Sequence, residues 1–331
     1  MRKINLLYAF VVMAAFSCSV SKKIESQEPA SKPLYADPVY DGAADPVVVW
    51  SPSEKKWFML YTNRRANLND TMGVKWVHGT RIGIAESKDG ATWTYRDTAN
   101  INYRPVTEYT HWAPEVILHN GLYHMYLTYV PGIFNDWNHP RNIVHLTSKN
   151  LFNWKFESVL KLANDKVIDA CVIQLPGGTW RMWYNNEKDG KSIYYADSKD
   201  LYTWQDKGKA IAARGEGPKV FKWKDTYWMI IDVWKGMEIY QSADLLQWKK
   251  QPGRVLEEPG SGKDDQAIGG HCDVVVNNDR AYIFYFTHPG RSKLAPPQSQ
   301  RRSVIQLVEL KYKDGILSCN RDEPAYIHLK N

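Results

Sequence analysis

The chain has 331 residues, of which 44% are hydrophobic and 24% charged, and its formal net charge is +7. The 14 Trp and 20 Tyr exclude an intrinsically disordered protein, and four cysteines are too few for a disulfide-stapled mini-fold. Only one long apolar run occurs, at the N-terminus, so the composition favours a globular, β-rich protein whose aromatic rings suit stacking on sugars or bases.

The first 18 residues have the pattern of a lipoprotein signal peptide. Arg2 and Lys3 form a positive n-region, an apolar run spans 6–16, and a small residue, Ser17, precedes Cys18. We expect cleavage before Cys18, lipidation of that cysteine, and an exported protein anchored to a bacterial membrane. A plain signal peptide with an incidental cysteine is the alternative, and the run is too short for a spanning helix.

Residues 19–38 are polar, contain three prolines and lack periodicity, which predicts a flexible tether. No basic cluster follows a helical pattern anywhere in the chain, so nucleic acid is not an expected partner. The sequence does not identify a protein partner.

A seven-residue pattern, Ser-x-Asp/Asn-x-x-x-Trp, recurs four times, beginning at Ser87, Ser148, Ser198 and Ser242. Ser and Asp suit a tight turn between two strands, and the Trp is expected to begin the next strand and pack inward. A short apolar strand precedes each copy, and two further strand-like runs lie upstream. Each unit therefore predicts one four-stranded blade.

A fifth unit, residues 270–312, repeats the first three strands but lacks the turn. A single blade cannot bury both of its faces, so the five units must stack around an axis. The sequence therefore predicts an all-β fold, a five-bladed β-propeller with four-stranded blades around a central channel, as a single domain over 39–331. A β-sandwich with coincidental turns is the alternative.

Polar residues open the innermost strand of four units, namely Asp45, Asp169, Glu216 and His271. The first residues of innermost strands converge at one mouth of a propeller channel, so we expect these side chains to meet. Converging carboxylates suit inverting glycoside hydrolysis. One carboxylate activates water, a protonated carboxyl donates to the leaving oxygen, and a third carboxylate raises the pKa of the acid.

The repeat and four short motifs resemble glycoside hydrolase family 43 over residues 40–320. The motifs are Asp45-Pro46, Trp112-Ala113-Pro114-Glu115, Ile168-Asp169 and Glu216-Gly217-Pro218. The resemblance implies a five-bladed propeller that cleaves arabinofuranosyl, xylosyl or galactosyl linkages with inversion. It implies that Asp45 is the general base, Asp169 the pKa-modulating and orienting residue, and Glu216 the general acid.

The same resemblance implies that His271 is a channel histidine, beside which a structural calcium ion is possible. No cofactor is expected to be required for the reaction. Two features depart from the family pattern, namely Glu115 in place of a common Asp and the residues after His271. Related propeller families that cleave 3,6-anhydrogalactose from agar oligosaccharides share the carboxylate plan.

Long loops are expected around the mouth at 62–80, 130–141 and 288–302. Loops of this kind on a rigid scaffold usually serve binding, and walls around a pocket favour exo action. The candidate substrate-binding residues are Arg64, Arg65, His111, Trp112, Trp137, Asn185, Trp234 and Arg291. Trp112 is the expected sugar platform, and ordinary packing is the alternative for each Trp. Two or more arginines in one pocket would favour an acidic glycan.

We expect an exo-acting, inverting glycoside hydrolase that releases a terminal sugar from plant or algal oligosaccharides. An anhydrogalactosidase or acidic-glycan glycosidase on the same fold is one alternative. A non-catalytic, surface glycan-binding propeller is another. Cys171 and Cys272 are expected to be small buried hydrophobic residues rather than metal ligands.

Overall fold

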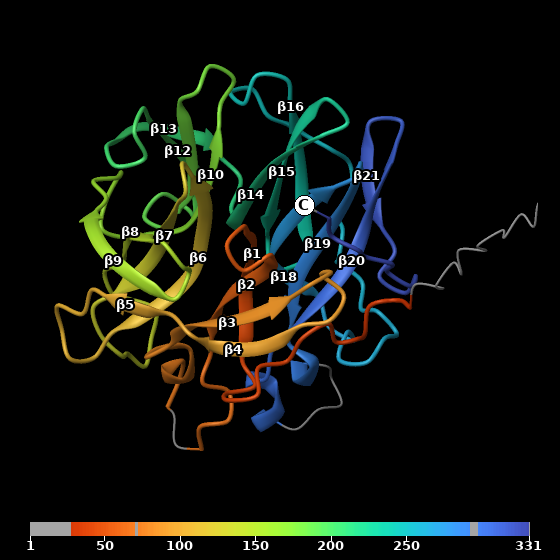
Figure 1. Ribbon diagram of the computed structural model, residues 1–331, viewed down its shortest axis with the longest axis horizontal. Helices are drawn as coiled ribbons and strands as arrows, with labels where there is room; N and C mark the ends of the chain where they lie inside the picture. The colour runs from red at the N-terminus through yellow and green to blue at the C-terminus, as the bar shows by residue number, and fades with distance from the viewer. Residues whose placement is uncertain (1–27, 70–71, 292–296, 331) are drawn as a thin grey trace, which may run out of the picture.

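The computed structural model describes residues 28–69, 72–291 and 297–330 and is nearly all-β (Figure 1). Its strands form five antiparallel sheets, which we call blades 1 to 5. Blade 1 comprises β1 (Ala43–Ser51), β2 (Lys56–Asn63), β3 (Arg81–Ser87) and β4 (Thr94–Thr98). Blade 2 comprises β6 (Thr110–His119), β7 (Leu122–Val130), β8 (Asn142–Ser148) and β9 (Asn153–Val159), with β5 (Asn100–Asn102) added parallel to β9.

The remaining blades have the same plan of four consecutive antiparallel strands. Blade 3 comprises β10 (Val167–Gln174), β11 (Trp180–Asn186), β12 (Ser192–Ser198) and β13 (Trp204–Ile211). Blade 4 comprises β14 (Glu216–Trp223), β15 (Thr226–Asp232), β16 (Met237–Ser242) and β17 (Lys249–Lys250). Blade 5 comprises β18 (Gly269–Asn277), β19 (Arg280–Thr287), β20 (Val304–Lys313) and β21 (Ile316–Cys319).

The innermost strands β1, β6, β10, β14 and β18 contact their neighbours in a closed ring, and apolar clusters fill the space between adjacent blades. In the described part of the chain the helices are short 3₁₀ turns, namely η1 (Lys75–Val77), η2 (Pro289–Arg291) and η3 (Pro297–Arg301). The predicted five-bladed propeller is therefore confirmed. No helix among the described residues is long and apolar enough to cross a membrane.

The repeated Ser-x-Asp/Asn-x-x-x-Trp pattern forms a self-contained turn between the third and fourth strands. In blade 3, Ser198 Oγ accepts the Leu201 N–H at 2.9 Å, and Asp200 Oδ1 accepts the Thr203 N–H at 2.7 Å. The Trp204 indole N–H donates to the Leu201 carbonyl at 3.2 Å, and the ring is buried. Because each residue type satisfies backbone groups within seven residues, the pattern is visible in the sequence.

A β-bulge follows the start of every innermost strand. In blades 1 to 4, two residues of the innermost strand oppose one residue of the second strand. The bulges place Asp45, Ala113, Asp169 and Gly217 at positive φ angles of 51°, 42°, 59° and 56°. In blade 5 the bulged residue is His271. Bulges re-aim side chains, and here they occur where the innermost strands open at the mouth.

Hydrogen bonds from the bulges tie each blade to the preceding one. The bulge amide donates to a polar side chain of the preceding blade in four pairs: Ala113 to Thr62 (2.8 Å), Asp169 to Thr128 (3.1 Å), Gly217 to Asp169 (3.1 Å) and His271 to Asp232 (2.9 Å). These bonds satisfy backbone groups that the bulges remove from the ladder. They also fix the distances between neighbouring mouth residues.

The two ends of the described chain close the ring between blades 5 and 1. Tyr35 pairs with Ile305 of β20, and the Leu329 N–H donates to the Asp89 carbonyl at 2.7 Å. Leu34 and Tyr35 are buried, so residues 30–38 pack onto the propeller and the expected flexible tether over 19–38 is wrong for this part. The propeller therefore begins earlier than the expected residue 39. The predicted signal peptide at 1–18 and residues 19–27 lie outside the described residues.

Candidate active site

Asp45, Asp169, Glu216 and His271 gather at one mouth of the channel. His271 Nδ1 lies 3.7 Å from Asp45 Oδ1 and 4.0 Å from Asp169 Oδ2. Asp169 Oδ2 also accepts the N–H of Gly217, the residue after Glu216, at 3.1 Å. A Cβ at Gly217 would stand 2.6 Å from the His271 ring, so glycine permits this close approach. The structure therefore brings together residues that are far apart in sequence.

Asp169 lies between two other carboxylates and is only 6% exposed. Burial raises the pKa of Asp169 well above its ordinary value, and the charges of Glu216 and Asp45 raise it further. Lys191 and the Gly217 N–H oppose this increase without reversing it. Asp169 therefore keeps its proton to higher pH than an isolated aspartic acid would.

Asp45 is held by a guanidinium group. Arg64 Nη2 donates to both Asp45 oxygens, at 3.1 and 3.3 Å, and Arg64 Nη1 contacts His288 Nε2 at 3.0 Å. His288 Nδ1–H donates to the Arg302 carbonyl at 2.9 Å. Burial, followed by the charges of Arg64 and Arg291, lowers the pKa of His288 well below its ordinary value. A neutral His288 can therefore accept from Arg64 and orient it toward Asp45.

Glu216 is the more accessible carboxyl group, with its side chain 26% exposed. The Trp234 indole N–H donates to Glu216 Oε1 at 3.0 Å, and Lys191 Nζ donates to Oε2 at 3.4 Å. Lys191 also pairs with Glu187 at 2.7 Å. Burial lowers the pKa of Lys191, but Glu216 and Glu187 outweigh it and the net shift is upward, so Lys191 remains a cation. Glu216 thus has a fixed carboxyl that solvent or substrate can reach.

Asp232 is a further carboxyl of the site that the sequence analysis missed. It faces Glu216 in the β14–β15 ladder, and its two oxygens accept the N–H groups of Trp234 at 2.7 Å and His271 at 2.9 Å. Burial, followed by the charge of Glu216, raises the pKa of Asp232 to about 7. Its place at the end of a second strand, opposite Glu216, was the signal that could have identified it. Lys191, in the β11–β12 turn, was also missed.

The other predicted residues of blades 3 to 5 differ in their roles. Asn185 is buried, and its amide donates to the carbonyls of Lys191 and Gly215, so it fixes the segments that carry Lys191 and Glu216. Trp234 contacts Glu216 directly, as described above. Arg291 ends η2 with an exposed side chain, near enough to Arg64 for the two charges to repel.

On blades 1 and 2, several predicted residues support the loops. Arg65 donates to the Lys75 carbonyl at 2.9 Å, and His111 is buried against the Tyr109 ring. Trp112 is 9% exposed, and its indole N–H donates to the Val77 carbonyl at 2.6 Å. This leaves little of the Trp112 ring for a sugar. Trp137, by contrast, is 53% exposed.

Below the mouth, a buried ion cluster crosses the channel. Lys219 Nζ lies 3.0 Å from Glu115 Oε2 and 2.8 Å from Asp273 Oδ1. Cys171 and Cys272 are free and buried, as expected of small hydrophobic residues. The Lys219 cation thus offsets part of the negative charge of the two carboxylates where water is scarce.

The described residues contain no group of three or more His, Cys, Asp or Glu side chains that could hold a metal ion. His271 offers one imidazole nitrogen, whereas calcium prefers six to eight oxygen ligands. Calcium beside His271 therefore stays a prediction, because the described residues do not offer a set of oxygen ligands for it.

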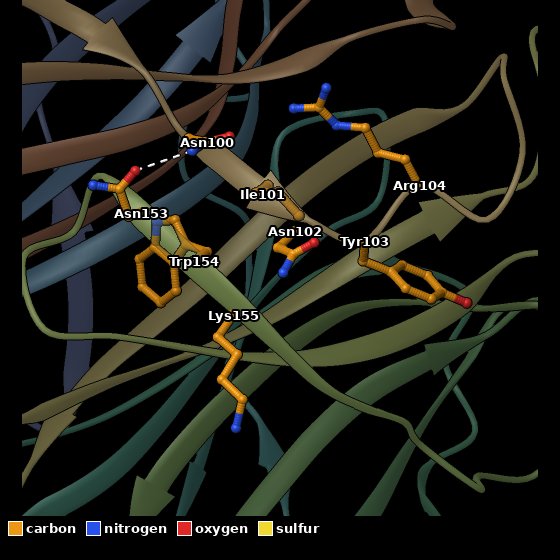
Figure 2. Close-up of a pocket in the computed structure, with 8 residues that line it drawn as sticks. All are labelled: Asn100, Ile101, Asn102, Tyr103, Arg104, Asn153, Trp154 and Lys155. Atoms are coloured by element: carbon orange, nitrogen blue, oxygen red, sulfur yellow. Dashed lines mark hydrogen bonds between the residues drawn. The ribbon is translucent and has the colours of Figure 1, made fainter.

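A hollow of about 630 Å³ opens elsewhere, on the outer edge of blade 2 (Figure 2). It is lined by β5 and β9 residues and by the adjoining Tyr103 and Arg104, and none of its lining side chains is a carboxylate. It therefore offers no carboxyl group for the acid–base pair that inverting glycoside hydrolysis uses.

A five-bladed propeller with a cluster of carboxylates at one channel mouth has the architecture of a propeller glycoside hydrolase. The family model for domains related to glycoside hydrolase family 43, described as a probable glycosyl hydrolase domain, matches residues 30–252. The chain belongs to this family, which confirms the predicted resemblance and the prediction of a glycoside hydrolase.

Solved structures of similar fold support the architecture. A thermostable family-43 glycoside hydrolase has a TM-score of 0.66 at 21% identity, covering 88% of this chain and 97% of that chain. A family-43 β-xylosidase/α-arabinofuranosidase from a compost microbial metagenome has a TM-score of 0.63 at 15% identity, with the same coverage of 88% and 97%. An exo-β-1,3-galactanase from Phanerochaete chrysosporium has a TM-score of 0.65 at 12% identity, covering 89% of this chain and 66% of that chain. Among curated proteins, none matches this chain.

Proposed function

We propose that the protein is an exo-acting, inverting glycoside hydrolase in which Asp45 is the general base and Glu216 the general acid. The observation that carries this proposal is the convergence of Asp45, Asp169 and Glu216 around His271. Inversion needs one carboxylate and one carboxylic acid on opposite sides of the scissile bond. Carboxyl groups that lie close together in different surroundings suit this division of roles, because the surroundings of a carboxyl group decide whether it acts as an acid or as a base.

The contacts of each carboxyl support its role. Asp45 is oriented by Arg64 deep in the mouth, where it can take a proton from water as the water oxygen bonds to the anomeric carbon. Glu216 stands nearer to solvent, where it can give its proton to the leaving oxygen as the glycosidic bond breaks. Asp169 accepts the N–H of Gly217, the residue next to Glu216, and so lies beside the proposed acid as the third carboxyl group of the site.

Exo action is supported by walls on one side of the mouth. The blade 1 loop contacts the blade 2 loop through the Val74 N–H, which donates to the Asn135 carbonyl at 3.0 Å. It contacts the blade 5 loop through Arg64 and His288. Three joined loops favour a pocket that accepts a chain end over an open cleft that accepts an internal segment.

The terminal sugar in this proposal is arabinofuranosyl, xylosyl or galactosyl, from plant or algal oligosaccharides. Structures with the same fold include an exo-1,5-α-L-arabinanase, a β-xylosidase and a β-1,3-galactosidase, which supports this range of sugars. We further propose export and a lipid anchor at Cys18. Loss of membrane association in a Cys18→Ser variant, measured by cell fractionation, would support the anchor.

The test compares the purified protein with its Glu216→Gln and Asp45→Asn variants on aryl arabinofuranosides, xylosides and galactosides and on the corresponding trisaccharides. We expect the parent to release a monosaccharide and both variants to lose at least about 100-fold in kcat, as removal of acid–base catalysis would cause. Proton NMR of the first product should show the inverted anomer. Release that survives both substitutions would refute the assignment, and tight binding without release would favour a glycan-binding propeller.

A further inference from the structure

A second hollow, of about 520 Å³, lies on the loop that joins β7 to β8. It is lined by Asp136, Trp137, Asn138 and His139 of this loop and by Lys166, which precedes β10. Trp137 is 53% exposed and is the most exposed tryptophan among the described residues. An exposed indole beside a hollow offers a flat apolar face on which a ligand can stack.

The lining of this hollow offers both hydrogen-bond donors and acceptors. His139 Nε2 lies 3.2 Å from Asp136 Oδ1, and Lys166 Nζ donates to Asn138 Oδ1 at 2.9 Å. A sugar presents hydroxyl groups at its edge and apolar C–H groups on its face. A flat indole beside mixed polar groups matches that pattern, and the absence of an excess of either charge in this lining favours a neutral sugar.

A chain of ion pairs connects the hollow to the proposed general acid. The Arg141 guanidinium donates to the Trp137 carbonyl, and Arg141 Nε lies 2.7 Å from Glu187 Oε2. Glu187 Oε1 lies 2.7 Å from Lys191 Nζ, which contacts Glu216. The Arg141 and Glu187 side chains are both nearly buried, so this chain holds the Trp137 loop at a fixed position relative to Glu216.

The position of the hollow relative to Glu216 indicates which part of an oligosaccharide would reach it. Glu216 protonates the leaving oxygen in the proposed reaction, so groups on its side of the mouth face the leaving group. Asp45, which acts on the opposite face of the terminal sugar, is held instead by Arg64 and His288 of blades 1 and 5. The ion-pair chain from the Trp137 loop ends at Glu216 and not at Asp45, and we therefore assign the hollow to the leaving-group side.

We propose that this hollow is a leaving-group subsite that binds a distal unit of a neutral oligosaccharide, with Trp137 as its stacking platform. The inference rests on the proposed function and adds a preference for chain length. Oligosaccharides that reach the hollow bind more tightly than shorter substrates that end before it. Arg141, Glu187 and Lys191 are positioning residues that set the distance between the subsite and Glu216.

The test measures binding by calorimetry in the Glu216→Gln protein, so that the ligands stay intact. The probes are xylotriose, β-1,3-galactotriose and α-1,5-arabinotriose, each with its disaccharide. When Trp137→Ala is combined with Glu216→Gln, we expect the affinity for the preferred trisaccharide to fall about 3- to 10-fold and the affinity for its disaccharide to stay unchanged. Trp137→Phe should retain most of the affinity. Tyr326→Ala, which removes an exposed aromatic ring from the C-terminal segment, is the matched control and should change neither.

Any result other than the expected selective loss of trisaccharide affinity overturns the proposed subsite. Equal trisaccharide binding with and without Trp137 refutes the subsite but leaves the proposed hydrolase intact, provided that the parent releases sugar. Equal weakening of disaccharide and trisaccharide refutes a distal subsite and places Trp137 at the terminal sugar. Binding of none of the probes refutes the subsite for these glycans and counts against the proposed function as well. Thermal unfolding of each variant verifies that the fold is retained.

Discussion

The contact between Trp234 and Glu216 permits a sharp test of how the proposed acid is positioned. Trp234→Phe removes one N–H donor, which lies 3.0 Å from Glu216 Oε1, and keeps an aromatic ring at the same place. The ring lies 5.2 Å from both Lys191 Nζ and the Arg214 guanidinium carbon, and phenylalanine can retain these cation–π contacts in weaker form. Trp234 has a φ of 58°, and both side chains carry the same Cβ, so backbone strain does not change.

The expected effect follows from the loss of one hydrogen bond to the acid. Such a bond contributes about 0.5–1.5 kcal/mol, and the 37% exposure of Trp234 lets water replace it in part. We expect a loss of about 1 kcal/mol in transition-state stabilisation, which corresponds to about a 5-fold fall in kcat. KM for an aryl glycoside should remain unchanged, because the removed donor contacts the enzyme's own carboxyl and not the sugar.

The assay is steady-state hydrolysis of the best aryl glycoside, across pH. Trp50→Phe is the matched control, since the Trp50 indole N–H is buried without a hydrogen-bond partner in the described part of the chain and is remote from the mouth. An unchanged kcat would refute the positioning role. A higher KM at constant kcat would show that Trp234 contacts substrate instead.

Three further predictions concern stability and reactivity. Burial lowers the pKa of His145 to about 3, so the stability that neutral His145 contributes is present above about pH 6.5 and is lost as the pH falls. His145→Asn should therefore reduce the loss of unfolding free energy between pH 7 and pH 5 by about 2 kcal/mol in urea titrations, and an identical pH dependence in parent and variant would contradict this. Lys219→Met leaves the Glu115 and Asp273 carboxylates buried without a cation and should lower the free energy of unfolding by about 3–5 kcal/mol at pH 7. A decrease of less than about 1 kcal/mol would contradict this and show that the cluster relaxes or admits water. Burial raises the pKa of the Cys171 thiol, so we expect it to react with a thiol reagent only on unfolding, and rapid labelling of the native protein, located by mass spectrometry, would contradict this.

The propeller was predictable because its signals are local. Ser198, Asp200 and Trp204 satisfy their turn within seven residues, so the same pattern marks blades along the chain. The convergence of Asp45 and Asp169 followed from the blade plan alone, since equivalent positions on innermost strands share one mouth.

Contacts between blades were not visible in this way. Lys191 reaches Glu216 from a turn in the neighbouring blade, and nothing in its local sequence distinguishes it from other surface lysines. The start of the propeller was misplaced for a related reason. Leu34 and Tyr35 lie among polar residues and prolines, and their burial depends on β20 and the C-terminal segment, which are distant in sequence.

The positive φ angles of Asp45 and Asp169 have a consequence for protein engineering. Left-handed backbone at a residue other than glycine costs about 1 kcal/mol or more, and blade 4 uses glycine at the equivalent bulge. Burial of charge adds to this cost at Asp169. Selection for thermostability alone would therefore favour glycine at these two positions and enrich inactive proteins, so libraries of this propeller need to be screened for turnover together with heat resistance.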